Sequence, residues 1–324
     1  MRYLNATEFA HVIPDDDYCD LVQTAYRHFG TERQVSSHPP IAVIHTGQVA
    51  SSIMSMKGAA LASQGVYGVF FGVRDAHYYF AVCDSTTGNM LGMVEQSASI
   101  CKRTGASSVV AASLLARPDA KVAAVVGSGK IATEVVRQLP RRFALDSIHV
   151  ASRTLQSARG LVDRLQPEIA CTLQAHGTVG EAVAEADIVV TITTASAPFI
   201  REGMLKPGSF LCSLGGVHEV EFGVLKEIDR LVVDDIGYAL WRGDFASWIA
   251  RGDISQTELQ KRINADIGQV ALGQAPGRRA GERSMAVIQG LALCDLVIAK
   301  EALERAQRAG IGTQISSAMQ MRKP

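Results

Sequence analysis

The chain has 324 residues, of which 47% are hydrophobic and 20% are charged. This is the composition of a folded globular protein, and the length suits about two domains of roughly 100–200 residues each. Lysine plus arginine and aspartate plus glutamate number 32 each, so the formal net charge is zero. Because general binding to nucleic acid needs a surplus of basic residues, this balance argues against a nucleic-acid partner.

The cysteines and histidines show no ligand pattern. No two of the six cysteines form a CxxC pair and no histidines stand in an HExxH arrangement, so we predict neither a metal site nor a disulfide framework. The N-terminal MRYLNATEFA lacks the apolar run of a signal peptide, and no stretch approaches the ~18 apolar residues of a membrane span. We therefore expect a cytoplasmic protein with reduced thiols and no membrane partner.

Short helices and strands are mixed in the first third of the chain. Apolar spacing and turn residues predict a helix over 15–29, a break at Pro39-Pro40, strands over 66–71 and 78–83, a turn over 84–88 and a helix over 103–116. The two strands carry an aromatic cluster that we expect in the sheet core or in a dimer interface, with an apolar ligand pocket as the alternative: Phe70, Phe71, Tyr78, Tyr79 and Phe80.

From residue 117 onward, short apolar runs alternate with helical segments. Strands are predicted over 121–126, 147–151, 187–191, 209–213 and 230–233, and helices over 155–165 and 178–186. Near-continuous apolar strands separated by helices indicate a parallel sheet covered on both faces. The predicted fold class is therefore α/β, with a Rossmann-type doubly wound parallel sheet and a second, α+β domain.

The last third of the chain carries three further predictions. Residues 285–308 are predicted as one long helix that leaves the sheet domain and packs on the N-terminal part. Trp241 and Trp248 are seven residues apart, about two helical turns, and are expected on one face of a helix. Asp234-Asp235 follows the last predicted strand and is expected to cap a helix.

The segment KVAAVVGSGKIA places a GxGxxA sequence between an apolar strand and the start of a helix. Gly127 permits the tight turn, Gly129 lets the backbone approach a pyrophosphate, and Ala132 allows close packing of the helix on the strand. The N–H groups at the helix start, within Ser128-Gly129-Lys130-Ile131, would face the phosphates. This context predicts a dinucleotide site, with a glycine turn that binds no nucleotide as the alternative.

The next strand ends in Ser152-Arg153-Thr154. NAD-selective sites usually place an acid here for the ribose 2′-hydroxyl, whereas a hydroxyl and a guanidinium suit a 2′-phosphate. We therefore predict NADP, with NAD as the alternative cofactor. Arg153 would otherwise stack on the adenine or lie in solvent.

Hydroxyl residues and glycines follow the next two strands. Thr193 and Thr194 come after the run 187–191, and Gly215 comes after the run 209–213. Because ligands of open parallel sheets bind outside the carboxyl ends of the strands, these residues are predicted to line the nicotinamide half of the cofactor. Helix capping by the threonines is an equal alternative.

The run RTGASSVVAASLLARPDAKVAAVVGSGKIA, which begins at Arg103, resembles the ornithine cyclodeaminase/mu-crystallin family. In that family an Arg-Thr-(Gly/Ala)-Ala helix leads into a Rossmann domain with a Gly-x-Gly-x-x-Ala loop. Further matching stretches follow in the same order, at 186–195, 205–209, 214–216, 233–235 and 288–292. The resemblance is close over roughly residues 85–305 and loose over the first 80.

The resemblance implies a substrate-binding and dimerisation domain, residues 1–116 with 294–324, and an NAD(P)-binding domain, residues 117–293. It implies a homodimer in which hydride passes between nicotinamide and the α-carbon of an amino or imino acid. It assigns Arg103 to the substrate carboxylate and adds Thr104 to the cofactor site. A helix-end arginine paired with a surface acid is the alternative for Arg103.

Three positions depart from the family pattern. Many members have an arginine after the Pro-Pro step, where this chain has Ile41-Ala42-Val43. The family's catalytic lysine has two possible placements: Lys57, the only lysine nearby, or by a stricter alignment Phe70, with Lys57 then a neighbouring site residue. Lys57 is the candidate proton donor, with an exposed residue before a loop as the alternative. The cyclodeaminase aspartate is replaced by Val217, and His218-Glu219 would act as a base only if turned inward.

These departures disfavour cyclodeamination, which has to manage a distal amine. Imine reduction needs a carboxylate clamp, a proton donor and a hydride, which Arg103, Lys57 and NADPH would supply. We therefore predict an NAD(P)-dependent oxidoreductase acting on a small imino or amino acid. A cyclodeaminase that releases ammonia, and a protein that binds NADP and a small ligand without turnover, are the alternatives.

Overall fold

The computed structural model describes residues 1–32, 41–45, 53–73 and 76–316. They form two compact units, which we call unit 1 (Met1–Arg103 with Leu291–Pro324) and unit 2 (Thr104–Gly290). The first boundary falls inside one helix, α3 (Ser99–Leu115), whereas the sequence places it at 116. The predicted break at Pro39-Pro40 lies outside the described residues. Within the described part of the chain, no helix is long and apolar enough to span a membrane.

Unit 1 contains a seven-stranded sheet in the order β15-β1-β6-β5-β4-β3-β2. All neighbours pair antiparallel except β1 and β6, which are parallel. The strands are β1 (Arg2–Leu4), β2 (Ala42–His45), β3 (Ile53–Leu61), β4 (Val66–Val73), β5 (Tyr78–Asp84), β6 (Met90–Glu95) and β15 (Thr313–Gln314). The mixed sheet and its helices confirm the predicted α+β character of this part.

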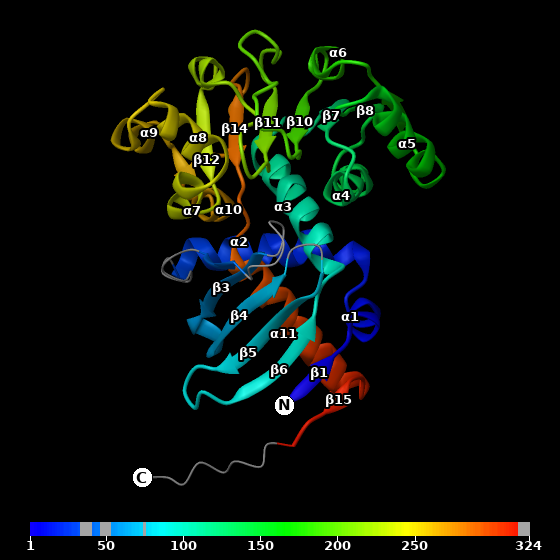
Figure 1. Ribbon diagram of the computed structural model, residues 1–324, viewed down its shortest axis with the longest axis vertical. Coiled ribbons are helices and arrows are strands. Elements are labelled where there is room, and N and C mark those ends of the chain that lie inside the picture. Colours follow the sequence, from blue (N-terminus) through cyan, green and yellow to red (C-terminus); the bar gives the residue numbers. More distant parts are fainter. Residues whose placement is uncertain (33–40, 46–52, 74–75, 317–324) are drawn as a thin grey trace. The chain divides into compact units, whose positions relative to one another are not determined.

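The described residues of unit 1 form helices α1 (Ala6–Val12), α2 (Tyr18–Glu32) and α11 (Ala292–Ala309) and the start of α3, with 3₁₀ turns at Asp15–Asp17 and Ala62–Gln64. α11 packs across one face of the sheet, against β3, β4, β5 and β6, and α2 packs on α11 (Figure 1). α2 buries Tyr18, Val22, Ala25, Tyr26 and Phe29, which recur at helical spacing and form its core-facing stripe.

The strand pleat sorts the aromatic cluster onto the two faces of this sheet. Phe70 and Phe80 are cross-strand partners, are buried, and lie on the face that α11 covers. Phe71 and Tyr79 are partners on the opposite face, where their rings stack at 5.7 Å. The predicted core position is therefore confirmed for the first pair, because alternate residues of a strand point to opposite faces.

Unit 2 contains an eight-stranded sheet in the order β13-β12-β14-β11-β10-β7-β8-β9, in which every pairing is parallel. The strands are β7 (Val122–Val126), β8 (Ser147–Ala151), β9 (Thr172–Ala175), β10 (Ile188–Thr191), β11 (Phe210–Ser213), β12 (Arg230–Val233), β13 (Ala265–Asp266) and β14 (Ser284–Val287). This is the predicted Rossmann-type doubly wound sheet, and its central strands are buried throughout.

The helices that connect these strands pack on the sheet (Figure 1). Besides α3 they are α4 (Lys130–Gln138), α5 (Leu155–Leu165), α6 (Val179–Val183), α7 (Ile236–Trp241), α8 (Gly243–Arg251), α9 (Gln256–Arg262) and α10 (Ile267–Ala271), with 3₁₀ turns at Leu139–Arg141, Gln166–Glu168 and Phe222–Lys226. Asp235 is the N-cap of α7, so the capping prediction is confirmed for this residue. Asp234 instead lies buried and accepts a hydrogen bond from the backbone N–H of Gly290.

The strand order reverses between β7 and β10, because the chain runs outward through β8 and β9 and then returns to β10. Parallel register brings the last residues of the strands to one edge: Ala151, Val126, Thr191, Ser213, Val287 and Val233. Such a reversal leaves a crevice at the carboxyl ends of the strands, which is where ligands of these sheets bind.

Two predictions in the last third of the chain are wrong. The helix predicted over 285–308 is divided into strand β14 and helix α11, because 284–287 inserts between β11 and β12, buried on both faces, and Gly290 then turns the chain with a φ of 96°. A fully buried strand has the same continuous apolar pattern as a buried helix. Trp241 and Trp248 lie on different helices, since Arg242 between them is extended, and Trp241 is exposed while Trp248 is buried.

Candidate functional site

A buried cluster of three charged side chains lies in unit 1. Arg103 donates two hydrogen bonds to Asp295, from Nε to Oδ1 at 2.9 Å and from Nη2 to Oδ2 at 3.1 Å. Lys57 Nζ lies 3.9 Å from the same Oδ2, and all three side chains are buried. The structure therefore brings together the two predicted catalytic residues around one carboxylate.

The two positions considered for the family lysine, 57 and 70, lie side by side in the sheet. Lys57 on β3 and Phe70 on β4 are directly opposed partners, and Lys57 Nζ lies 5.2 Å from the centroid of the Phe70 ring. A lysine on either strand would point to the same face, because opposed residues of antiparallel strands share a side. Lys57 is buried and is not the exposed residue of the alternative interpretation.

Asp295 is the residue of this cluster that the sequence did not single out. It lies in the first turn of α11, in a segment that is otherwise apolar. Burial disfavours the charge of Arg103, but the Asp295 carboxylate outweighs this effect, and the pKa of Arg103 lies above its ordinary value. The sequence did hold a signal for this residue. Asp295 is a single acid within an apolar helical run, and a charge that is buried requires a partner.

The glycine loop follows β7 at the switch point of unit 2. Gly127 has a φ of 137°, and an added Cβ would clash with the carbonyl oxygen of Ile192, which follows β10. Gly129 is the N-cap of α4, and an added Cβ there would meet no described protein atom within 4 Å. No described side chain caps the helix. Its first N–H groups and the open side of Gly129 thus fit a pyrophosphate.

The ends of β7 and β8 meet beside this loop. Ser128 Oγ and Ser152 Oγ share a hydrogen bond of 2.8 Å. Arg153 is exposed at the same edge, and Thr154 is the N-cap of α5, accepting from the N–H of Ser157 at 3.2 Å. Thr154 therefore has a local capping role, while Ser152 and Arg153 offer a hydroxyl and a guanidinium.

The ends of β10 and β11 are tied together by Glu219. Its Oε1 accepts from the N–H and the hydroxyl of Thr193 at 2.5 and 2.7 Å, and its Oε2 accepts from the hydroxyl of Thr191 at 2.7 Å and the N–H of Gly215 at 2.9 Å. Burial raises the pKa of Glu219 to about 7, against the opposing effect of these donors. Both carboxylate oxygens of Glu219 are thus occupied by donors of these two strand ends, so the side chain fixes Thr193 and Gly215 in place.

A second buried acid, Asp244 on α8, supports the same loop. It accepts from the hydroxyl of Ser213 at 2.6 Å and from the N–H groups of Glu219 and Val220 at 2.7 and 2.9 Å. Burial raises its pKa. His218 is buried too, and its Nε2 makes no hydrogen bond to any described residue. Val217 is 48% exposed, so an apolar side chain stands where the cyclodeaminase aspartate is expected.

The remaining predicted cofactor residues are distributed over the same unit. Lys130 and Thr194 are exposed, and Thr104 on α3 and Ile131 on α4 are half-buried. Among the residues that the structure describes, no group of three or more His, Cys, Asp or Glu side chains could hold a metal ion.

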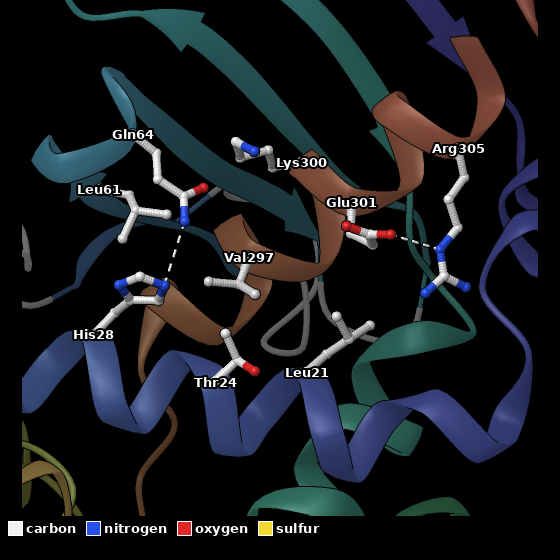
Figure 2. A pocket seen from close by; sticks show the side chains of 9 residues that line it. All are labelled: Leu21, Thr24, His28, Leu61, Gln64, Val297, Lys300, Glu301 and Arg305. Atoms are coloured by element: carbon white, nitrogen blue, oxygen red, sulfur yellow. Dashed lines mark hydrogen bonds and ion pairs between the residues drawn. The ribbon is translucent and has the colours of Figure 1, made fainter. Parts of the chain in front are cut away.

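Figure 2 shows a pocket of about 310 Å³ in unit 1 between α2, α11 and the turn after β3. Two pairs of its polar side chains contact one another, with Glu301 accepting from Arg305 at 2.7 Å and His28 lying 3.3 Å from Gln64. None of the predicted catalytic residues lines it, and we assign it no role.

A parallel, doubly wound sheet with a glycine loop at its switch point defines unit 2 as a Rossmann-type domain, carried by a chain with a second α+β unit. The chain belongs to the ornithine cyclodeaminase/mu-crystallin family, whose model matches residues 71–310.

Individual relatives agree with this assignment. A Delta(1)-pyrroline-2-carboxylate reductase of Bacillus cereus is 26% identical over 330 residues, which cover 97% of this chain and 99% of the relative. The Thermococcus litoralis Delta(1)-pyrroline-2-carboxylate reductase, solved with NADH and L-proline, shares the fold with a TM-score of 0.86 at 21% identity, covering 97% of this chain and all of the other. The iminosuccinate reductase of Paracoccus denitrificans, solved with NAD⁺, has a TM-score of 0.88 at 20% identity, covering 98% and 99%.

Proposed function

We propose that this protein is an NAD(P)-dependent oxidoreductase that reduces a small imino acid to the amino acid. The proposal rests on the buried cluster in which Lys57 and Arg103 share the carboxylate of Asp295. A protein that only binds a dinucleotide has no need of a buried ammonium beside a buried guanidinium, since burying charge is costly. The imine reductases among its relatives support this reaction class.

Each side chain has a defined task in this reaction. When bound, NAD(P)H supplies the hydride, which adds to the imine carbon. Arg103 would hold the carboxylate of the substrate by exchanging its two hydrogen bonds to Asp295 for two to the substrate, since an arginine fork suits either carboxylate. Lys57 donates a proton to the imine nitrogen, so that C=N becomes CH–NH and the lysine is left neutral until it takes a proton from water.

Unit 2 would bind the cofactor through the glycine loop and the adjoining strand ends. We propose that the pyrophosphate lies on Gly127–Ile131 at the start of α4, and that Thr193 and Gly215 face the nicotinamide half. Thr104 and Thr194 are the outer members of this proposed site. Ser152 and Arg153 support a preference for NADP, because a hydroxyl and an exposed guanidinium suit a 2′-phosphate.

The alternative of ornithine cyclodeamination has less support. The exposed Val217 offers nothing to a distal amine, and Glu219 is occupied by four hydrogen bonds. Reduction of an imine requires neither a polar side chain at Val217 nor a free base at Glu219.

We further propose that the protein acts as a homodimer in the cytoplasm. The sheet face of unit 1 opposite α11 carries exposed apolar side chains on β2 and β4, the two strands that flank β3, among them Ile44, Tyr67 and Val69, which are 47%, 37% and 38% exposed. A contiguous apolar sheet face of this kind suits a second copy of the chain. The six free cysteines suit a reducing compartment.

Oxidation of NADPH and NADH in the presence of cyclic and linear imino acids tests the proposed function, with ornithine assayed in parallel for ammonia. We expect reduction of an imino acid with NADPH preferred, and a loss of kcat of about 100-fold or more in Lys57→Met. Lys226→Met, which removes a lysine that is 70% exposed, is the matched control and should retain the wild-type rate. Ammonia from ornithine would establish a cyclodeaminase, and tight NADP binding without turnover of any imine would establish a binding protein.

A further inference from the structure

Arg242 occupies a defined position at the carboxyl edge of the unit 2 sheet. It separates α7 from α8 in an extended conformation, with φ −145° and ψ 159°. α7 follows β12, and Arg242 packs against the Gly215-Gly216 segment that follows β11. The side chain therefore lies at the proposed binding edge, between the segment that follows β11 and the helix that follows β12.

Two glycines make room for this arrangement. An added Cβ on Gly216 would clash with Nη2 of Arg242 and lie 2.6 Å from its Nε, so the guanidinium rests directly on the Gly216 backbone. Gly243 has a φ of 76°, and a Cβ there would lie 2.6 Å from Nε2 of Gln289 and 3.0 Å from the carbonyl oxygen of Gly215. Gln289 Nε2 also donates to that carbonyl at 3.2 Å, which holds the turn in register.

The charge of Arg242 is not neutralised within the part of the chain that the structure describes. The one hydrogen bond of its guanidinium there runs from Nη1 to the hydroxyl of Tyr238 at 3.4 Å, and no described carboxylate lies within 4.0 Å of the guanidinium. The nearby acids are engaged elsewhere, Glu219 with Thr191, Thr193 and Gly215, and Asp244 with Ser213 and two backbone N–H groups. A half-buried guanidinium without a counter-ion is a receptor for an anionic group.

The phosphates of the proposed cofactor would be held at a different part of the edge. The glycine loop and Ser152 follow β7 and β8, on the other side of the switch point from β11 and β12. Arg242 instead adjoins Gly215, proposed above to face the nicotinamide half, where hydride leaves the cofactor. Val217 and Trp241 flank it, 48% and 54% exposed, and carry no charge.

We propose that Arg242 binds a second carboxylate, carried by the side chain of the substrate, so that the preferred substrates are short imino dicarboxylic acids. This assignment rests on the proposed imine reduction and names its substrate class. A distal amine would be repelled at this position, and an uncharged side chain would leave the guanidinium without a partner. Arg242 is thus a specificity-determining residue.

Matched substrates test the assignment. Imines formed with ammonia from oxaloacetate and from pyruvate differ by one carboxylate. We expect kcat/KM to favour the dicarboxylate by about 100-fold. Arg242→Gln should lose about that factor on the dicarboxylate and change less than about threefold on the monocarboxylate, with the loss mainly in KM, and Arg242→Lys should be intermediate. Arg251→Gln, which changes an exposed arginine of α8, is the control and should leave the preference unchanged.

A binding measurement separates failure of this inference from failure of the proposed function. Titration of the protein–NADP⁺ complex with succinate and with propionate requires no turnover. Succinate binding that is lost in Arg242→Gln supports the assignment even if no imine is reduced. Equal kcat/KM for the two imines, or succinate affinity unchanged in Arg242→Gln, overturns it while leaving imine reduction intact.

Discussion

At the scale of single residues, the chemistry of unit 1 depends on one buried carboxylate. Asp295 receives both hydrogen bonds that Arg103 directs toward α11 and lies within ion-pair distance of Lys57. A buried pair of this kind adds little net stability, but removal of one partner leaves a charge without compensation. Asp295 therefore determines whether the two cations can both be held inside the unit.

Asp295→Asn should lower the free energy of unfolding by about 3–5 kcal/mol, because Arg103 would remain buried and charged without its carboxylate. Glu304→Gln on the same helix removes the partner of Lys300, a partly exposed pair at 2.6 Å, and should cost about 0.5 kcal/mol or less. Urea denaturation of both variants measures the difference. Equal losses would show that Asp295 does not act through the buried cations.

Glu219 makes the stability of unit 2 depend on pH in a defined direction. Its pKa rises from 4.5 to about 7 in the folded protein, mainly through burial. Between these values the folded state holds more protons than the unfolded state, so stability falls as the pH rises through this window and is constant above it. Burial raises the pKa of Asp234 to about 6, which acts in the same direction.

Glu219→Gln should reduce the loss of stability between about pH 5 and about pH 8, by up to about 3 kcal/mol relative to the wild type. Asp234 is present in both proteins, so the comparison isolates Glu219. Denaturant titrations at the two pH values provide the measurement. An identical pH dependence in the two proteins would contradict an elevated pKa at Glu219.

Single residues also show how far the sequence predicted the site. Arg103 was found because motif order placed it, Lys57 because it is the only lysine near the family position, and the structure brings both to one carboxylate. Asp295 was missed because its partners are distant in sequence, Arg103 lying 192 positions before it. Arg242 was missed because its significance depends on its contact with Gly216, which no local pattern reveals.

At the scale of elements, the β7–loop–α4 segment was predicted correctly because its signal is local. The apolar strand, the glycines and the start of the helix are consecutive, and the structure places the strand at Val122–Val126 and the helix at Lys130–Gln138. β14 was mistaken for a helix because its neighbours, β11 and β12, are supplied by distant parts of the chain. The part of α3 that follows residue 103 was also predicted correctly, because the signal for a helix lies within that one segment of the chain.

The two glycines of this loop should respond differently to substitution. Gly127→Ala forces a Cβ against the Ile192 carbonyl at a φ of 137° and should destabilise the protein by more than about 1 kcal/mol. Gly129→Ala meets no described atom and should leave stability nearly unchanged, yet weaken NADPH binding because the Cβ occupies the side that a pyrophosphate approaches.

Thermal unfolding and fluorescence titration with NADPH distinguish the two effects. Each variant serves as the control for the other, since both replace a glycine of the same loop by alanine. Undiminished NADPH affinity in Gly129→Ala would argue against a pyrophosphate at this loop.

At the scale of the whole molecule, the uncovered face of the unit 1 sheet has consequences for assembly. Its exposed residues include Ile44 on β2 and Tyr67 and Val69 on β4. An apolar face of this extent on a sheet favours association with a second copy.

Val69→Asp should convert the proposed dimer to a monomer, because a charge would be buried in the proposed interface without a partner. Leu272→Asp introduces the same charge on an apolar residue of unit 2 that is 36% exposed, and should leave the dimer intact. Light scattering at micromolar concentration measures the mass. A dimeric Val69→Asp protein would place the interface elsewhere.

Unit 1 is assembled from the two ends of the chain, with all of unit 2 between them. During synthesis the ribosome releases Lys57 and Arg103 first, then the whole of unit 2, and only afterwards Asp295 with α11. Unit 2 can fold as a contiguous piece, whereas the sheet of unit 1 must wait for the helix that covers it and for the counter-ion of its cations. Pulse-labelled hydrogen exchange during refolding should therefore show protection of β7, β10 and β11 before β3, β4 and β5, so that the cation cluster is the last part of the protein to form.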